Sequence, residues 1–249
     1  MDILTQGLEK CGIPQNIIAP LAEKMEAYIK EIVLFNSAYN LTNTSDHDEL
    51  VTRHILDSLA AYKVIAELAE AAGGAGGPAT GGTRGADSGA GDASGASSSA
   101  FAPAPILADI GSGGGLPGIP LAAVFFHTFP SLKICLVERM EKRCAFLENC
   151  AAILGLKNVE VINSEAERLE MESFDLITFR AFRPLDKKMT KTLLRIVRPG
   201  GSLCAYKAKL SSIQEEMSGI NALVPDYRIE PLCVPGLEDS ERNLVIIRK

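Results

Sequence analysis

The stretch that most constrains the fold is a short apolar run that leads into a turn made almost entirely of glycine. The run over residues 106–110 predicts a buried strand. The glycines that follow it are Gly111, Gly113, Gly114, Gly115 and Gly118. Because glycine accepts positive φ and has no Cβ, this backbone can turn sharply and lie against a ligand. An apolar helix pattern opens at Gly118, which completes the order of strand, turn and helix that seats a nucleoside-bearing cofactor.

The glycine pattern does not by itself identify the cofactor. Read from Gly111, it is G-x-G-x-x-L and departs from the dinucleotide fingerprint at its last position. Read from Gly113, it matches G-x-G-x-x-G but starts two residues beyond the strand. A plain glycine-rich loop is the alternative interpretation of this stretch taken alone.

Strand and helix patterns alternate after the turn. Further strands are expected over 132–138, over 159–167 with an exit loop, over 174–181 and over 202–209, with amphipathic helices between them. Two last strands, over 227–234 and 242–249, have no helix between them and must pair antiparallel. This order predicts an α/β fold with a doubly wound, mostly parallel sheet of seven strands.

Two segments precede this Rossmann-like domain, which we place at 105–249. Residues 1–71 predict a helical extension, because apolar side chains recur at helical spacing and Asp46 or Ser45 can cap a further helix. Residues 72–104 are mostly Gly, Ala, Ser and Pro, so they bury too little apolar surface to offset the entropy of ordering. We expect a flexible insertion there, without site residues.

Charge and hydropathy limit the function classes. The 249 residues carry a net charge of −6, which disfavours a nucleic-acid partner unless a local basic patch exists. No apolar run is long enough for a membrane span and the first residues show no signal segment, so we expect a cytoplasmic protein. The six cysteines lack C-x-x-C spacing, which predicts buried, reduced thiols. The three histidines are not spaced as metal ligands, and no metal is expected.

The carboxyl ends of the strands are where such sheets bind ligands. Glu138 ends the second strand, about 20 residues beyond the glycine turn, where a carboxylate hydrogen-bonds an adenosine ribose. A solvated strand-end carboxylate is the alternative. Ala166, Glu167 and Arg180 lie at the ends of the next strands. NAD and S-adenosylmethionine both carry adenosine, and only the terminal antiparallel pair favours the methyltransferase arrangement, by fold analogy.

A polar cluster falls on one expected helix before the insertion. His54 and Asp57 are three residues apart and Arg53 and Asp57 four apart, so each pair can interact on one helix face. A salt-bridged face that packs the helical extension onto the main domain is one interpretation. A polar rim around a substrate is the other, and the spacing alone favours the first.

A basic stretch runs from Arg180 to Lys209. It holds nine basic residues and one acid, a local net charge of +8 in a chain of −6. Five of the nine, Lys187, Lys188, Lys191, Arg195 and Arg198, follow helical spacing and are equally explained as the solvated face of an amphipathic helix. Arg183 and Lys207 sit at strand exits, and we predict that they contact RNA phosphates.

Seven stretches in order carry a family resemblance. They are YNLTN (39–43), RHILDSL (53–59), ADIGSGGGLPGIPLA (108–122), ERMEKRCAFL (138–147), FRAF (179–182), RPGG (198–201) and AYKAK (205–209). With them the chain resembles the glucose-inhibited division protein B family, the 16S rRNA guanine-N7 methyltransferases. It departs from the family at Phe179, where a serine is usual, and in the insertion.

The resemblance implies a class I fold that binds S-adenosylmethionine. By residue correspondence it implies that Gly111, Leu116, Ala166, Glu167 and Arg180 bind the cofactor, beside Gly113 of the turn and Glu138. It also implies that the side carrying Asn40, Arg53 and His54 faces the RNA. The expected partner is small-subunit 16S rRNA or an assembling small subunit, and the chain is expected to be a monomer.

The expected chemistry needs no catalytic acid or base. Guanine N7 attacks through a lone pair and loses no proton first, so alignment and desolvation matter most. We therefore assign no catalytic residue, His54 included. Two alternatives stay open: an NAD-dependent reductase, for which the sequence shows no hydride-acceptor site, and a non-catalytic RNA-binding or scaffold protein.

Overall fold

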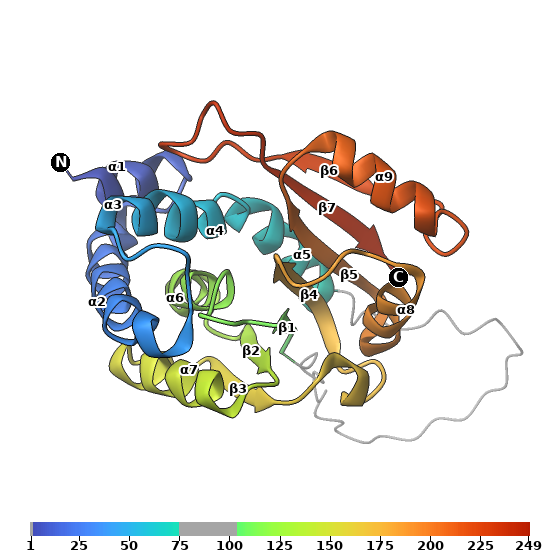
Figure 1. The fold of residues 1–249 in the computed structure, drawn as a ribbon, viewed down its shortest axis with the longest axis horizontal. Helices are drawn as coiled ribbons and strands as arrows, with labels where there is room; N and C mark the ends of the chain where they lie inside the picture. The colour runs from blue at the N-terminus through green and yellow to red at the C-terminus, as the bar shows by residue number, and fades with distance from the viewer. Residues whose placement is uncertain (1, 75–103) are drawn as a thin grey trace, which may run out of the picture.

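The computed structural model describes residues 2–74 and 104–249, which build a seven-stranded sheet flanked by helices (Figure 1). The strands are β1 (Ile106–Ile110), β2 (Lys133–Glu138), β3 (Val159–Asn163), β4 (Phe174–Arg180), β5 (Val197–Lys207), β6 (Arg228–Pro231) and β7 (Asn243–Arg248). Their order across the sheet is β3-β2-β1-β4-β5-β7-β6. Strands β1 to β5 pair in parallel, and β7 is antiparallel to both β5 and β6. The predicted fold class is confirmed, with its antiparallel last pair.

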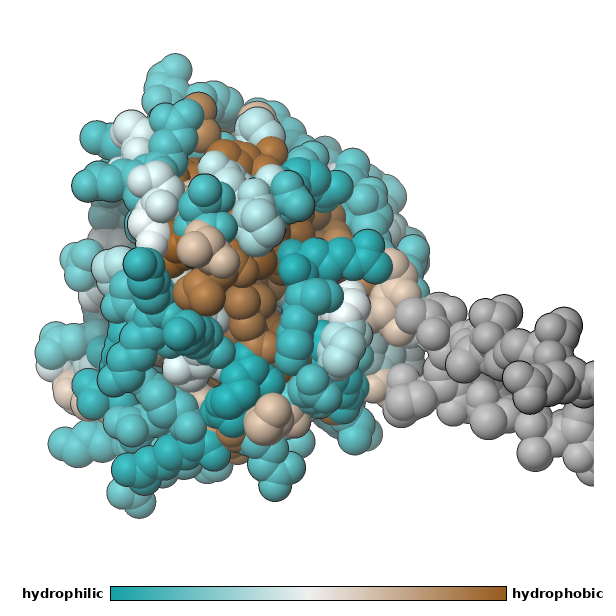
Figure 2. Space-filling view, turned by 90° about the vertical axis from the view of Figure 1, so that its right-hand side faces the viewer, coloured by the Kyte–Doolittle hydropathy of each residue, from teal (hydrophilic) through white to brown (hydrophobic). Residues whose placement is uncertain are grey.

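Helices cover both faces of the sheet, because alternate side chains of each strand enter different cores. On β1, Leu107 joins one core and Ala108 and Ile110 join the other. The first core holds the N-terminal helices with α6 (Gly118–Thr128) and α7 (Glu141–Ile153). The second core lies under α8 (Lys187–Ile196) and α9 (Leu210–Ile220). Figure 2 faces the side of the molecule that carries α8 and α9, where apolar side chains gather inside a hydrophilic rim.

The N-terminal region is helical, as predicted. Its helices are α1 (Ile3–Lys10), α2 (Gln15–Tyr39), α3 (His47–Leu50), a π-helical turn (Val51–Leu56), α4 (Asp57–Leu59) and α5 (Tyr62–Gly74). Asp46 is the residue that caps α3, accepting from the Glu49 amide at 2.9 Å. The buried Tyr28 hydroxyl of α2 donates to the Gly114 carbonyl. This contact ties the helical extension to the glycine turn.

The expected insertion falls mostly outside the described residues, which stop at 74 and resume at 104. Its first three positions belong to α5, which runs to Gly74. Among the helices described, none combines the length and apolarity that a bilayer crossing requires.

Three local predictions were wrong. The helix expected to carry Arg198 ends at Ile196, and Val197 pairs with Phe174 as the first residue of β5, which was expected to start at 202. Arg198 therefore leaves the helix and pairs with Asp175 at 2.6 Å. Arg195 is only partly exposed, and its guanidinium donates to the carbonyls of Ala166 and Glu167.

The cysteine prediction holds for five thiols and fails for one. Cys11, Cys135, Cys144, Cys150 and Cys204 are buried and free. Burial raises the pKa of the Cys135 thiol to about 11 and that of the Cys11 and Cys204 thiols to about 12, and it also raises the pKa of Cys144 and Cys150. Cys233 is exposed, because it follows the short strand β6 in the connection to β7.

Candidate cofactor and acceptor site

The glycine turn follows β1 and leans against the end of β2. The amides of Gly111 and Ser112 both donate to the Val137 carbonyl, at 2.8 and 3.1 Å. Gly111 has a φ of 71°, and a Cβ placed there would lie 2.2 Å from the ring of Phe182. Only glycine satisfies both the backbone conformation and this close approach.

Glu138 faces the turn from the end of β2. It is buried, and its Oε2 accepts from the Gly113 amide at 3.0 Å while Oε1 accepts from the Met140 amide at 2.9 Å. Each carboxylate oxygen has two lone pairs, so both oxygens keep acceptor capacity for ligand hydroxyls. Glu138 lines a cavity of about 220 Å³, which we name the first cavity.

The first cavity collects most of the residues predicted from strand ends. Gly111, Glu138, Ala166 and Glu167 line it, together with Phe182. Ala166 and Glu167 form a short 3₁₀ turn after β3, and Arg195 holds both of their carbonyls. A carboxylate at the end of the second strand beside a glycine turn is the arrangement in which such sheets hold the ribose of an adenosine.

A second cavity of about 390 Å³ adjoins the first, and Gly111, Arg143 and Ala181 line both. The remaining members predicted from sequence, Gly113, Leu116 and Arg180, line the second cavity rather than the first. Arg53 and His54, which were expected on the RNA side, also line it. The polar cluster and the cofactor residues therefore share one cavity.

A third cavity of about 630 Å³ opens beyond the carboxyl ends of β4 and β5. Arg180, Arg183 and Lys207 line it, along with Phe182. Ala181 lines all three cavities and has a φ of 50°, a left-handed conformation that is uncommon for alanine. Backbone strain of this kind gathers at functional sites, and here it marks the point where the cavities meet.

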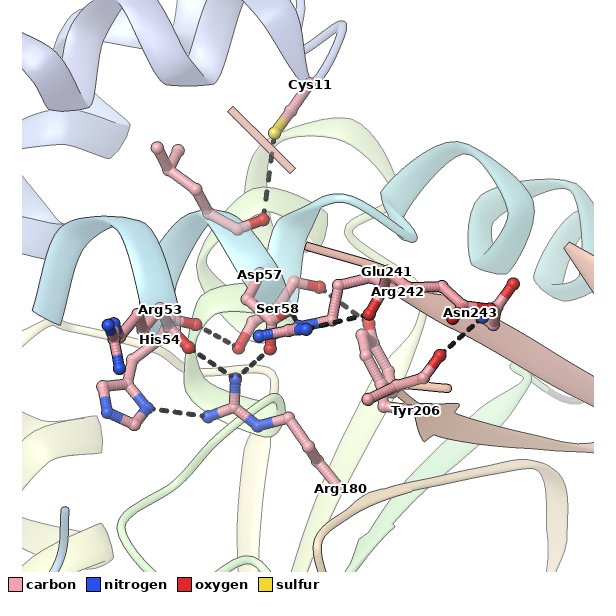
Figure 3. A network of polar contacts seen from close by, with 12 residues as sticks. Cys11, Arg53, His54, Asp57, Ser58, Arg180, Tyr206, Glu241, Arg242 and Asn243 are labelled. Carbon is pink, nitrogen blue, oxygen red and sulfur yellow. Dashed lines mark hydrogen bonds and ion pairs between the residues drawn. The ribbon is translucent and has the colours of Figure 1, made fainter. Parts of the chain in front are cut away.

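Arg180 is the centre of a polar network that joins the helical extension to the sheet (Figure 3). Its Nη1 donates to Asp57 Oδ2 at 2.6 Å and to the Arg53 carbonyl at 3.3 Å. Its Nη2 lies 3.2 Å from His54 Nδ1. Asp57 Oδ1 accepts from Arg242 Nε at 3.1 Å. The predicted packing role of the cluster is present, and the same groups line the second cavity.

The expected pairing of Arg53 with Asp57 was wrong. Arg53 pairs with Glu49 at 3.7 Å, and Asp57 pairs with Arg180 and Arg242. The cause is the π-helical turn Val51–Leu56, which bonds i to i+5 and shifts the faces that α-helical spacing assumes.

Two titratable groups of the site have strongly shifted pKa values. Burial, and then the Arg180 charge, lowers the pKa of His54 to about 4, so its ring is neutral near pH 7. Since Arg180 can only donate, His54 Nδ1 accepts and its proton is on Nε2. Burial raises the pKa of Asp109 to about 7, although its Oδ2 accepts from the Gly118 amide at 3.0 Å.

Comparison with known proteins identifies the family. The family model described as GidB, rRNA small subunit methyltransferase G, matches residues 21–79 and 95–245. The ribosomal RNA small subunit methyltransferase G of Treponema denticola is 38% identical over 248 residues, covering 99% of this chain and 94% of that protein. The protein of the same name from Xanthomonas axonopodis is 35% identical over 247 residues, covering 99% and 95%. The chain belongs to the GidB family.

Solved structures also align with this GidB-family chain. A SAM dependent methyltransferase from Aquifex aeolicus superposes with a TM-score of 0.44 at 19% identity, over 58% of this chain and 82% of that chain. The family resemblance drawn from the sequence motifs is confirmed by the family model and by the relatives.

The predicted RNA contacts are placed unevenly. Arg183 is half exposed, lies 3.5 Å from Glu167 and contacts the Phe182 ring. Lys207 is only 17% exposed and pairs with Glu216 at 2.6 Å, so it is not the free cation that its strand-end position suggested. Asn40 offers its backbone carbonyl to Arg143 at 3.0 Å and is not among the residues that line the three cavities.

Sequence reasoning missed Arg143 and Phe182, which line the cavities beside the predicted residues. Both belong to stretches that carried the resemblance, ERMEKRCAFL and FRAF. Glu138 and Arg180 were singled out there because they end strands, whereas Arg143 lies inside a helix and Phe182 beyond the strand. Among residues 2–74 and 104–249, no group of three His, Cys, Asp or Glu side chains is gathered as a metal site.

Proposed function

We propose that this protein transfers the methyl group of S-adenosylmethionine to N7 of a guanine in small-subunit 16S rRNA. The observation that carries the proposal is a GidB-family chain in which an adenosine-type cavity and a larger, basic cavity meet at one segment, 181–183. Such a junction lets a cofactor and a second substrate approach each other from two sides.

The cofactor fits the first and second cavities by the chemistry of their walls. Glu138 supplies an acceptor for ribose hydroxyls, and the bare backbone at Gly111 admits a close ligand. Gly113, Leu116 and Arg180 line the adjoining cavity, while Ala166 and Glu167 close the first. These seven residues are the cofactor contacts that we propose.

The reaction needs position more than proton transfer. Bound S-adenosylmethionine supplies an electrophilic methyl group, and guanine N7 supplies the lone pair. The chain's own residues hold the partners in line and exclude water. His54 is neutral at pH 7, but no proton leaves N7, so we assign it no role as a base.

The third cavity is the proposed side for the acceptor. It lies beyond the ends of β4 and β5, where Arg183 and Lys209 line it, and Ala181 joins it to both other cavities. Basic side chains at its edge suit phosphate contacts, which position RNA without reading its sequence. On the side of the helical extension, the RNA contacts that we propose are Asn40, Arg53 and His54. We propose a cytoplasmic monomer that acts on rRNA or on an assembling small subunit.

Calorimetric titration and a filter assay test the proposal together. Wild-type protein is expected to bind S-adenosylmethionine and not NAD, and to transfer tritiated methyl from the cofactor to 16S rRNA. Tight binding of NAD without binding of S-adenosylmethionine would support the reductase alternative. RNA binding without any methyl transfer would support the non-catalytic alternative.

A further inference from the structure

Arg143 lies where the first and second cavities adjoin. It is the third residue of α7, is partly buried and lines both cavities. Its Nη1 lies 3.8 Å from the point where a Cβ on Gly113 would stand. The guanidinium therefore rests beside the backbone of the glycine turn, on the same side as the ligand space.

The guanidinium uses little of its hydrogen-bonding capacity. Nη2 donates to the Asn40 carbonyl at 3.0 Å, and the buried Nε has no acceptor among the described residues. An arginine has five N–H donors in a planar fork that matches a carboxylate. Asn40 ends α2 in a left-handed conformation, and its carbonyl holds this fork in place.

The other cations around the second cavity already have partners. Arg180 pairs with Asp57 at 2.6 Å, and Arg53 pairs with Glu49 at 3.7 Å. His54 is neutral near pH 7. Within the described part of the chain, no carboxylate lies within ion-pair distance of Arg143. Among the cations that line the second cavity, Arg143 is therefore the one whose charge a bound anion would neutralise.

We propose that Arg143 binds the carboxylate of the amino-acid end of S-adenosylmethionine. This assignment rests on the proposed function for the identity of the cofactor. The cofactor has hydroxyls at its ribose and an anion at its other end. Glu138 accepts hydrogen bonds from the ribose hydroxyls and repels the carboxylate of the amino-acid end. That carboxylate therefore belongs in the second cavity, where Arg143 offers paired N–H donors.

Two ligands that differ by a single group test the assignment: S-adenosylmethionine and decarboxylated S-adenosylmethionine. Arg143→Ala is expected to weaken S-adenosylmethionine binding about ten- to hundredfold, the value of one charge-assisted contact. The affinity of Arg143→Ala for the decarboxylated ligand should differ from that of wild type by less than about threefold. Lys142→Ala, an exposed neighbour on α7, should change neither. Isothermal titration calorimetry of wild type and the two variants with each ligand measures all six affinities.

Arg143→Lys keeps the charge without the fork and is expected to lose part of the discrimination. It serves in place of the alanine variant if that variant melts at a lower temperature than the assay. Equal losses for both ligands would show that Arg143 only supports the fold, and no loss for either would remove it from the site. Both results overturn the assignment while S-adenosylmethionine binding by wild type stands. A wild type that fails to bind S-adenosylmethionine overturns the proposed function first.

Discussion

Asp57 Oδ2 lies 2.6 Å from Arg180 Nη1, and this ion pair joins the helical extension to the end of β4. The same carboxylate accepts from Arg242, which precedes β7. Asp57 is buried, and its two arginines are largely covered. One carboxylate thus holds three segments that are far apart in sequence, at the wall of the proposed site.

We expect Asp57→Asn to destabilise the fold and the site together. Removing the anion leaves two arginines facing each other with little water, which costs about 3 kcal/mol of unfolding free energy. The midpoint temperature should fall by roughly 10 °C. Calorimetric unfolding measures the change. Asp48→Asn, at an exposed ion pair with His47, is the matched control and should stay within about 0.5 kcal/mol of wild type.

His54 is expected to make stability depend on pH in the acid range. Its folded pKa of about 4 lies below the ordinary 6.5, so the unfolded chain takes up the proton more readily. The contribution of neutral His54 to the free energy of unfolding is complete above pH 6.5 and is lost as the pH falls from 6.5 through 4. Urea unfolding of wild type and His54→Gln at intervals across this window checks it. The prediction fails if the difference between the two proteins is the same at every pH.

Gly111→Ala is expected to reduce cofactor affinity at least tenfold, because the new Cβ would displace the Phe182 ring that lines the first cavity. Gly155→Ala is the matched control. Gly155 also has a positive φ, of 63°, but a Cβ there meets nothing within 4 Å. Both variants bear the backbone strain of about 1 kcal/mol, and only the first should lose binding. A similar loss of affinity in both would show that the space at Gly111 is irrelevant.

RNA binding should respond to Arg183 more than to Lys207. Arg183→Ala is expected to lower the slope of affinity against salt by roughly one, the effect of one lost phosphate contact. Lys207→Ala should do less, because Glu216 already neutralises that charge at 2.6 Å. Lys188→Ala, on the exposed face of α8, is the control. Equal and negligible effects from all three would move the RNA surface to the side of Asn40, Arg53 and His54.

The sheet could be predicted from sequence because each strand is a local apolar run with its own boundaries. The glycine turn and Glu138 were found for the same reason, since the turn directly follows β1 and Glu138 is the last residue of β2. The antiparallel pairing of β6 with β7 followed from the short connection between them. The strands and the direction of the last pair could therefore be predicted from local sequence, whereas the start of β5 could not.

Most of the errors concern side-chain partners on other elements of the fold, whereas the Arg53–Asp57 error came from the π-helical turn. Arg195 and Arg198 have the spacing of a solvated helix face, yet they bind the Ala166 and Glu167 carbonyls and Asp175. Lys207 is neutralised by Glu216 of α9. Such partners are decided by tertiary packing, which local periodicity does not contain.

The position of the transferred methyl group tests the central claim most directly. Wild-type protein is incubated with S-adenosylmethionine labelled in its methyl group and small-subunit rRNA, and the digested nucleosides are identified by mass spectrometry. A matched transcript carries 7-deazaguanosine, which has carbon in place of N7. We predict 7-methylguanosine from ordinary rRNA and no transfer to the deaza transcript. Equal methylation of both transcripts, or label on another base or on ribose, would contradict the account.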